Sequence, residues 1–382
     1  MRIAYAMINC NRSDGSARAL VEVAERLAIR HDVHLFARTV RDVDLSRIHW
    51  HCIPGPGWPE VADFVSFFAL ASWVMSRESF EIRHSVGCNA MGASVYTIQN
   101  IQPAKRLHLS RIASSEKVSM PRRFTRWLYL EATSRAERMA YSDKRGNPRR
   151  LFLPVSAGVA AELKQYYSIG DAGVSVIPNA ADTVRFSPCS GDDRSRIRLE
   201  LGLPANAVLF AFVGGEWARK GLDLAIQSIP MWSDSDAHLV VIGDDPDRRR
   251  FYDMAQSLGV SNRVVFAGFS PHVEQWLQAC DAMLFPSWYE AFSLATIEAA
   301  ACGLPLIATK INGTEDFVEP RVTGLFCEHD PASIARAVNE LADDPALRKA
   351  MGESARKKVE TLYTWDRVAD LTEAAYNEVL SR

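Results

Sequence analysis

Two basic side chains stand next to each other in a glycine-rich turn in the second half of the chain. The segment Val213-Gly-Gly-Glu-Trp-Ala-Arg-Lys-Gly221 follows a buried-strand pattern and precedes a helical one. Glycines let a backbone approach a phosphate closely, and the N–H groups of a helix start can bind it. Arg219 and Lys220 add the positive charge that a leaving diphosphate requires where no metal ion neutralises it. The pattern predicts phosphate contacts at Gly214, Gly215, Arg219 and Lys220, although an ordinary turn with surface charges would have the same composition.

Two glutamates flank the start of a later predicted helix. Glu290 precedes the helix, Ser293 is its expected N-cap, and Glu298 lies two turns further on. A ligand lying along this start would place a phosphate on the N–H groups of Ser293 and Leu294, a ribose hydroxyl on Glu298 and sugar hydroxyls on Glu290. Favourable contact with the helix dipole explains Glu290 as well, but not Glu298, which lies past the first turn. We therefore expect the ligand to contact Glu290, Ala291, Phe292, Ser293, Leu294 and Glu298.

Other motifs carry weaker signals. Gly15 and Ser16 follow the first predicted strand, where they would face a donor phosphate or sugar. Asp245-Pro-Asp247 has the spacing of a metal-binding carboxylate pair, but a solvated turn is the better interpretation. The segment Gly87–Gly92 has glycines at P-loop spacing and lacks the Lys-Ser/Thr that a phosphate-binding loop needs.

Length and composition restrict the kind of protein. The chain has 382 residues, a formal net charge of −2 and 48% hydrophobic residues, which is typical of a globular protein with two domains. Its seven cysteines include no CxxC pair, which argues against a zinc site and favours a reducing compartment. We expect no metal site, no signal peptide, no membrane span and a cytoplasmic location.

Strand and helix patterns alternate along the whole chain, which predicts two doubly wound parallel α/β units in tandem. We expect an N-terminal domain at 1–182, joined by a C-terminal helix at 365–382, and a C-terminal domain at 183–364. The cleft between such units is the default active site. The stretch 105–150 holds thirteen Lys or Arg and four Asp or Glu, with aromatic residues at 127–129. It is either a solvated surface or a patch for anionic lipid or a phosphorylated acceptor.

The order of these motifs resembles the family-four retaining glycosyltransferases. The resemblance rests on Gly214-Gly215 with Arg219-Lys220-Gly221, on Phe285-Pro-Ser, on the Glu290 and Glu298 pair, on Gly303-Leu-Pro305, and on Gly313 with Thr323-Gly-Leu-Phe326. Asn179-Ala-Ala-Asp182 is similar to the family's linker motif, with Ala180 where glycine is usual. The segment 218–223 is most similar to bacterial enzymes that add glucose to the lipopolysaccharide core.

The resemblance implies the GT-B fold, two Rossmann-like domains that face each other across a cleft. It implies transfer of a hexose, glucose or a close relative, from a nucleoside diphosphate sugar, with UDP expected, to a glycan, glycolipid or small-molecule hydroxyl. Arg219, Lys220 and Glu290 would be the catalytic residues of a front-face reaction that retains configuration and uses no metal or cofactor. It implies polysaccharide or lipopolysaccharide biosynthesis and no nucleic-acid partner. If the stretch 105–150 is a patch for anionic lipid, the expected contact is a peripheral one with the inner face of the cell membrane.

Two departures from the family pattern keep alternatives open. The arginine that often follows the strand's glycine is replaced by Gly215 and Glu216, so Arg219 and Lys220 must supply the charge. The strand expected at 94–98 ends in Gln99 and Asn100, where many members carry histidine. The main alternative is a catalytically inactive nucleotide- or glycan-binding protein on the same fold. An inverting transferase lacks an evident base, and a dinucleotide oxidoreductase lacks GxGxxG after the first strand.

Overall fold

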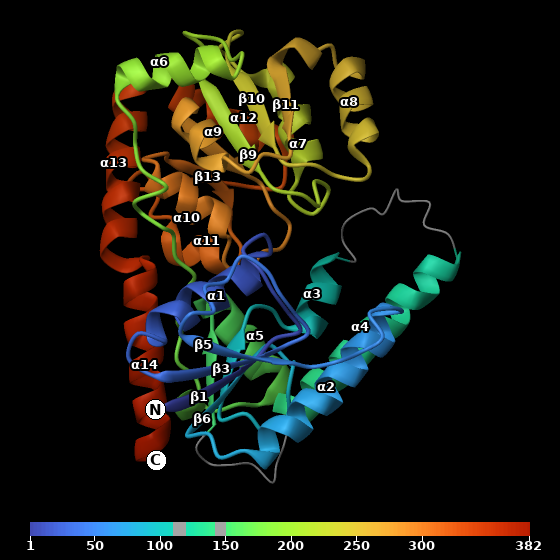
Figure 1. Ribbon diagram of the computed structural model, residues 1–382. Coiled ribbons are helices and arrows are strands. Elements are labelled where there is room, and N and C mark those ends of the chain that lie inside the picture. Colours follow the sequence, from blue (N-terminus) through green and yellow to red (C-terminus); the bar gives the residue numbers. More distant parts are fainter. Residues whose placement is uncertain (110–119, 142–149) are drawn as a thin grey trace. The chain divides into compact units, whose positions relative to one another are not determined.

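The protein is described by a computed structural model that covers residues 1–109, 120–141 and 150–382 (Figure 1). The described residues form two compact units. Among the described residues, unit 1 holds 1–107, 120–141, 150–179 and 365–382, and unit 2 holds 108–109 and 180–364. The chain leaves unit 1 after Asn179, three residues earlier than the sequence suggested. The N–H of Ala181 donates to the Tyr363 carbonyl at 3.0 Å, which ties the linker to unit 2.

Unit 1 is built on a six-stranded parallel sheet with the order β5-β3-β1-β6-β7-β8. Its strands are β1 (Arg2–Ala6), β3 (Asp32–Ala37), β5 (Ile48–Cys52), β6 (Ile82–Val86), β7 (Val95–Ile98) and β8 (Leu151–Pro154). The short strands β2 (Asn9–Cys10) and β4 (Thr39–Val40) pair in parallel as a separate sheet. The strand order reverses between β1 and β6. Ligands of such sheets bind at the carboxyl ends of the strands beside this reversal.

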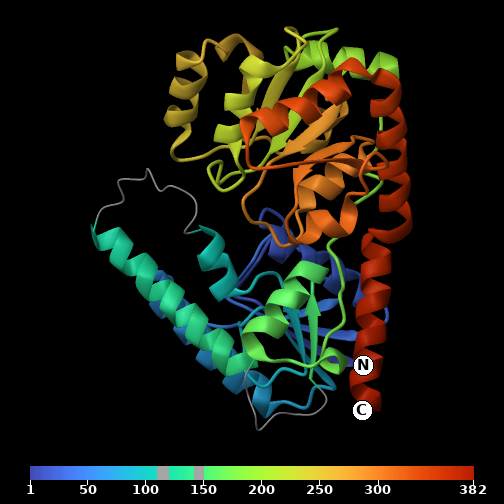
Figure 2. The same cartoon turned by 180° about the vertical axis from the view of Figure 1, so that it is seen from behind.

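Successive side chains of β1 point to opposite faces of this sheet. Ala4 and Ala6 join the apolar cluster of α2, which includes Phe67. Tyr5 points the other way and its hydroxyl lies 2.7 Å from that of Tyr376 in the last helix. The sheet is therefore covered on both faces by helices (Figure 2). These are α1 (Gly15–Leu27), α2 (Glu60–Arg77), α3 (Gln102–Leu109), α4 (Met120–Tyr141), α5 (Ala157–Tyr167) and α14 (Trp365–Ser381), with the 3₁₀ turn η1 (Asp171–Gly173).

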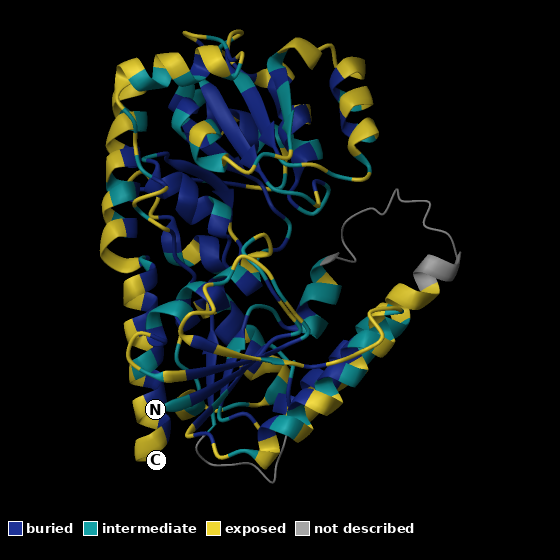
Figure 3. Cartoon of the chain, in the orientation of Figure 1, coloured by how far each residue is buried: buried dark blue, intermediate teal, exposed yellow. Residues whose placement is uncertain are grey.

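Unit 2 repeats the architecture with the order β11-β10-β9-β12-β13-β14, and all its strands are parallel. The strands are β9 (Leu209–Val213), β10 (His238–Ile242), β11 (Val264–Gly268), β12 (Ala282–Phe285), β13 (Leu306–Thr309) and β14 (Gly324–Cys327). Most of their residues are buried, as the dark strands in Figure 3 show. Continuous apolar runs are what a parallel sheet covered on both faces requires.

The helices of unit 2 divide between the two faces of its sheet. Helix α7 contacts both α8 and α12, while α10 packs on α13 and α6 packs on α9. Their bounds are α6 (Gly191–Glu200), α7 (Leu222–Ser228), η2 (Ile229–Met231), α8 (Arg248–Ser257), η3 (Ser261–Arg263), α9 (Val273–Ala279), α10 (Leu294–Ala301), α11 (Asn312–Phe317), α12 (Pro331–Asp343) and α13 (Pro345–Leu362). Helix α10 ends as expected before Gly303, which has a left-handed φ of +80°. The prediction of two parallel-sheet α/β domains is confirmed.

The basic stretch 105–150 is described only in part. Its residues 110–119 and 142–149 lie outside the described residues, while residues 105–109 of α3 and the whole of α4 are described. On α4 the rings of Phe124 and Trp127 stack with centroids 6.0 Å apart and are both more than half exposed. Within the described ranges, no helix is both long enough and apolar enough to cross a membrane.

Candidate functional site

The strand order of unit 2 brings two distant turns together. It reverses between β9 and β12, so the turns that follow Val213 and Phe285 leave the sheet side by side. The two turns are joined by a hydrogen bond of 2.9 Å from the N–H of Trp288 to the carbonyl of Arg219. The topology therefore places the predicted phosphate turn beside Glu290, which is more than sixty residues away along the chain.

Arg219, Lys220 and Glu290 form one cluster. Arg219 Nη1 donates to Glu290 Oε2 at 3.0 Å, and Lys220 Nζ lies 3.3 Å from the same oxygen. Arg219 also donates to the Tyr289 carbonyl at 2.6 Å and to the Glu216 carboxylate at 2.8 Å. The side chains of Arg219 and Lys220 are only 14% and 11% exposed. Charge-assisted bonds of this kind hold the two cations in fixed positions.

Glu290 and Arg219 keep their charges over the whole physiological range. Burial alone would raise the pKa of Glu290, but the charges of Lys220 and Arg219 outweigh this and lower the pKa to about 2. Burial alone would lower the pKa of Arg219, while Glu290 and Glu216 raise it above its usual value. Lys220 has three N–H donors, and one of them is directed at Glu290. Donor capacity therefore remains for an anionic ligand.

The backbone of the glycine turn is shaped by close contacts. Gly214 has φ of +121°, and a Cβ there would lie 2.7 Å from Lys220 Cε. Trp217 fixes the turn, because its indole N–H donates to the Gly214 carbonyl and its backbone N–H donates to Asp245 Oδ2, both at 2.9 Å. Asp245 also accepts from the N–H of Asp247 at 2.8 Å. Asp245 is thus occupied by backbone N–H groups that shape the turn, which accounts for the carboxylate pair that resembles a metal motif.

Gly221 offers a test of this packing. Its φ is +76°, and a Cβ would lie 2.2 Å from the Pro286 carbonyl oxygen. We expect Gly221→Ala to lower the free energy of unfolding by about 3 kcal/mol, because strain and overpacking add. Gly202→Ala is the matched control, because Gly202 has φ of +67° with nothing within 4 Å of its Cβ position, and only strain remains, about 1 kcal/mol. Urea unfolding of both variants measures the difference, and equal losses would contradict the packing argument.

The start of α10 follows Glu290 directly. Ser293 is the N-cap residue, and its side chain makes no capping bond to any residue that the structure describes. Ala291, Phe292, Ser293 and Leu294 are all buried, and Gly313 packs on Ala291 and Phe292 at distances that leave no room for a Cβ. Glu298 is 6% exposed and has interactions within the protein. Whether these residues and Gly214 and Gly215 contact a nucleotide stays a prediction.

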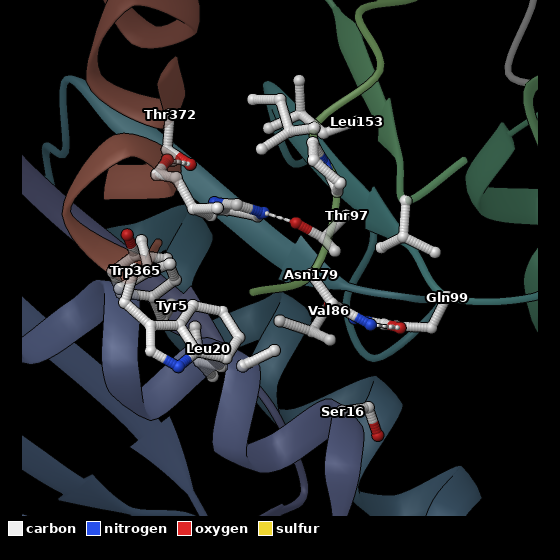
Figure 4. A pocket seen from close by; sticks show the side chains of 17 residues that line it. Tyr5, Ser16, Leu20, Val86, Thr97, Gln99, Leu153, Asn179, Trp365 and Thr372 are labelled. Atoms are coloured by element: carbon white, nitrogen blue, oxygen red, sulfur yellow. Dashed lines mark hydrogen bonds between the residues drawn. The ribbon is translucent and has the colours of Figure 1, made fainter. Parts of the chain in front are cut away.

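The two candidates of unit 1 begin helix α1. Gly15 and Ser16 are its first residues, and Asp14 caps it by accepting from the N–H of Ser16 at 3.2 Å. One N–H of this helix start is therefore already satisfied by a carboxylate. Ser16 borders a cavity of about 40 Å³ that also touches Gln99 and Asn179, which gives room for a few water molecules (Figure 4).

Gln99 and Asn179 are paired through their side-chain amides at the rim of this cavity. Gln99 Nε2 donates to Asn179 Oδ1 at 3.2 Å, and Asn179 Nδ2 donates to Gln99 Oε1 at 3.4 Å (Figure 4). At the other end His84 lies 2.8 Å from the Thr97 hydroxyl and 2.6 Å from that of Tyr376. Burial lowers the pKa of His84 to about 3, so this imidazole is neutral. Asn179, the first residue of the linker motif, is thus hydrogen-bonded to Gln99, the residue that follows β7.

Three groups of the unit 2 cluster were missed by sequence reasoning. Glu216, which has φ of +50°, accepts hydrogen bonds from Arg219. The Tyr289 carbonyl also accepts from Arg219, and Asp245 shapes the turn by accepting from the N–H of Trp217. Gly243 is also part of the turn, because a Cβ there would lie 2.4 Å from the Gly214 carbonyl. The sequence signal for this contact was a glycine directly after each of the two neighbouring strands, Gly214 after β9 and Gly243 after β10.

Comparisons with known proteins find similarity to glycosyltransferases. Residues 193–358 match the family described as Glycosyl transferases group 1. A D-inositol 3-phosphate glycosyltransferase from Streptomyces bingchenggensis is 30% identical over 235 residues, which are 58% of this chain and 51% of that protein. The chain thus spans about half the length of this curated relative.

Solved structures share the fold over almost the whole chain. The crystal structure of WaaG, a glycosyltransferase involved in lipopolysaccharide biosynthesis, matches 97% of this chain and 99% of its own, with a TM-score of 0.78 and 20% identity. The Anabaena protein Alr3699/HepE, solved in complex with UDP-glucose, matches 100% of this chain and 99% of its own, with a TM-score of 0.73 and 19% identity. The two units therefore have the GT-B fold of these structures, and residues 193–358, less than half of the chain, are similar to the group 1 glycosyl transferases.

Proposed function

We propose that this protein is a retaining glycosyltransferase that moves a hexose from a nucleoside diphosphate sugar to a hydroxyl group. The observation that carries the proposal is the cluster of Arg219, Lys220 and Glu290 at the carboxyl ends of β9 and β12. Two fixed, poorly hydrated cations would stabilise a diphosphate as negative charge develops on it. Glu290 holds both cations and would contact hydroxyls of the transferred sugar.

The reaction follows from what the family resemblance implies. The bond from the anomeric carbon to the diphosphate oxygen breaks, and the acceptor oxygen bonds to that carbon on the same face. The leaving diphosphate oxygen takes the acceptor's proton, so the reaction needs no dedicated base and no metal ion. Arg219, Lys220, Gly214 and Gly215 would hold the diphosphate together with Ser293 and Leu294, and Glu298 would bind the ribose.

UDP and glucose are the proposed donor groups, and the complex of Alr3699/HepE with UDP-glucose supports this choice. The acceptor is proposed to be a glycan, a glycolipid or a small-molecule hydroxyl. Ser16, Gln99 and Asn179 line one cavity of unit 1, and Gly15 precedes Ser16 at the start of α1. We propose that this edge of the sheet contacts the sugars. The exposed rings of α4 support a further proposal, that the stretch 105–150 touches anionic lipid, which flotation with vesicles containing phosphatidylglycerol measures.

Calorimetric titration tests the donor site. The purified protein in EDTA is titrated with UDP, GDP, ADP and NAD, and we expect micromolar binding of one nucleoside diphosphate. That nucleotide then selects the sugars for a transfer assay, in which the anomeric configuration of the product reports retention. Binding without transfer of any sugar would favour the alternative, an inactive nucleotide- or glycan-binding protein. Binding of NAD alone, or of none of the four, would overturn the donor site.

A further inference from the structure

A buried carboxylate outside the donor cluster lies directly behind the end of β7. Glu137 of α4 is 2% exposed, and its two oxygens lie 3.1 and 3.2 Å from the N–H of Gln102. Gln102 is the first residue of α3, so this carboxylate occupies an N–H that a helix start leaves unpaired. The hydroxyl of Tyr167 in α5 donates to Glu137 Oε1 at 2.5 Å. Helices α3, α4 and α5 therefore meet at one carboxyl group.

The helix start that Glu137 holds is continuous with the two residues that replace the family's histidine. Gln99 and Asn100 precede Gln102 by two or three residues, and the Gln102 side chain donates to Asn100 Oδ1 at 3.4 Å. Gln99 is held on its other side by Asn179. The turn from β7 to α3 is therefore fixed at both ends, by Asn179 on one side and by Glu137 on the other.

We propose that Glu137 is a positioning residue, which sets the backbone of Gln99 and Asn100 through the first turn of α3 and is itself oriented by Tyr167. The proposal rests on the proposed function, in which the end of β7 contacts the sugars. Nothing about the donor cluster of unit 2 requires a buried acid at this place. A carboxyl group that only filled space would be replaced there by an apolar side chain at lower cost.

The ionisation of Glu137 controls how firmly the turn is held. An ionised carboxylate accepts from both Gln102 and Tyr167, whereas a protonated one must use one oxygen as a donor. Burial raises the pKa of Glu137 to about 7, opposed by the bonds from Tyr167 and Gln102 and by the charge of Arg106, while Glu162 of α5 raises it further. Cys88 and Tyr141 also face this site, and burial raises the pKa of both, so both stay neutral. Arg106 Nη1 lies 3.8 Å from Glu131 Oε2, and among the described residues Arg106 Nε and Nη2 have no hydrogen-bond partner, so Glu131 and Glu137 share its charge.

We expect the transfer rate to change with pH near the pKa of Glu137, which gives a step in the pH–rate profile. The transfer rate of the wild type should rise roughly fivefold between pH 6 and 8, the difference between a charge-assisted and a neutral hydrogen bond. The thermal midpoint should fall more steeply between pH 5 and 7 in the wild type than in Glu137→Gln. The folded state holds the proton more tightly than the unfolded state, so stability is lost as pH rises from the usual glutamate range to about 7.

Three variants and one spectroscopic signal test the proposal. Glu137→Gln should remove the pH step in the transfer rate and leave nucleotide affinity unchanged. Tyr167→Phe should move the midpoint of this pH step to higher pH, because it removes a hydrogen bond that lowers the pKa of Glu137. Glu200→Gln, an exposed acid of α6 whose Oε1 lies 3.8 Å from Arg196 Nε, is the control and should keep the wild-type profile. With selective ¹⁵N-glutamine labelling, the Gln102 amide should titrate near pH 7 in the wild type and not in Glu137→Gln.

The two proposals fail in different ways. A Gln102 amide that does not titrate, or a pH step that survives in Glu137→Gln, would overturn the positioning role. A Gln102 amide signal that titrates, with a midpoint at higher pH in Tyr167→Phe, would support the positioning of the turn. If the same protein transfers no sugar, the transferase function is rejected. If Glu137→Gln does not fold, Tyr167→Phe decides between these outcomes alone.

Discussion

The Arg219→Ala variant is expected to transfer sugar at least about a hundredfold more slowly than the wild type. Arg219 is the group that connects the turn after β9 with Glu290, Glu216 and the Tyr289 carbonyl. Its loss removes a fixed cation from the place where negative charge develops, and it leaves Glu290 with Lys220 alone. Nucleotide affinity in EDTA should fall in the same variant, since both the ground state and the transition state carry the diphosphate.

Two further variants separate charge from geometry at this position. Arg219→Lys keeps the charge but has no planar fork to bond three acceptors, so it should recover only part of the activity. Arg196→Ala is the control, because Arg196 is an exposed arginine of α6 that pairs with Asp193 on the same helix. Steady-state kinetics with the best donor and calorimetry with its nucleotide measure all three. An Arg219→Ala variant with unchanged rate and affinity would remove this residue from the site.

Much of unit 2 was predictable because its signals are local. The apolar run that becomes β9 and the glycines after it stand next to each other in sequence. The strand order then brings the turn after β12 beside them without further information. That the chain turns back at Gly303 was also expected, since glycine takes a left-handed φ at low cost.

The partners of the site were less predictable than its charges. Glu216 and Asp245 are both polar residues of turns, and sequence alone does not distinguish a solvated carboxylate from one that shapes a phosphate turn. Asp245 becomes significant only because a backbone N–H, that of Trp217, points at it. Backbone donors carry no sequence signal of their own.

The acid behind β7 shows a different limit. Glu137 looks like any acid of an amphipathic helix, and in the sequence it is one of four in a mainly basic stretch. Its role depends on how α3, α4 and α5 converge, which is a matter of tertiary packing. The short strands β5 and β8 are likewise hard to predict, because four or five residues give too few periods to separate a strand from a loop.

Glu290 supplies the second large effect. Replacing Glu290 by glutamine should lower the transfer rate by about a hundredfold or more, because Arg219 and Lys220 lose the carboxylate that fixes them. The same change should lower the free energy of unfolding at pH 7 by about 3 kcal/mol, the penalty of breaking a largely buried charge pair. Arg219→Ala and Glu290→Gln should not be additive, since each removes the contact between them.

The pH dependence of Glu290 distinguishes it from Glu137. The pKa of Glu290 is lowered to about 2, so its stabilising contribution is complete above the usual glutamate range and is lost only as pH falls toward 2. Urea unfolding of wild type and Glu290→Gln should therefore differ fully at pH 7 and progressively less below pH 4. Between pH 5 and 8 Glu290 contributes no step to the rate, and the step near pH 7 belongs to Glu137 alone. A rate profile of Glu137→Gln that still falls below pH 7, or a stability difference that does not shrink in acid, would contradict the assignment of these two acids.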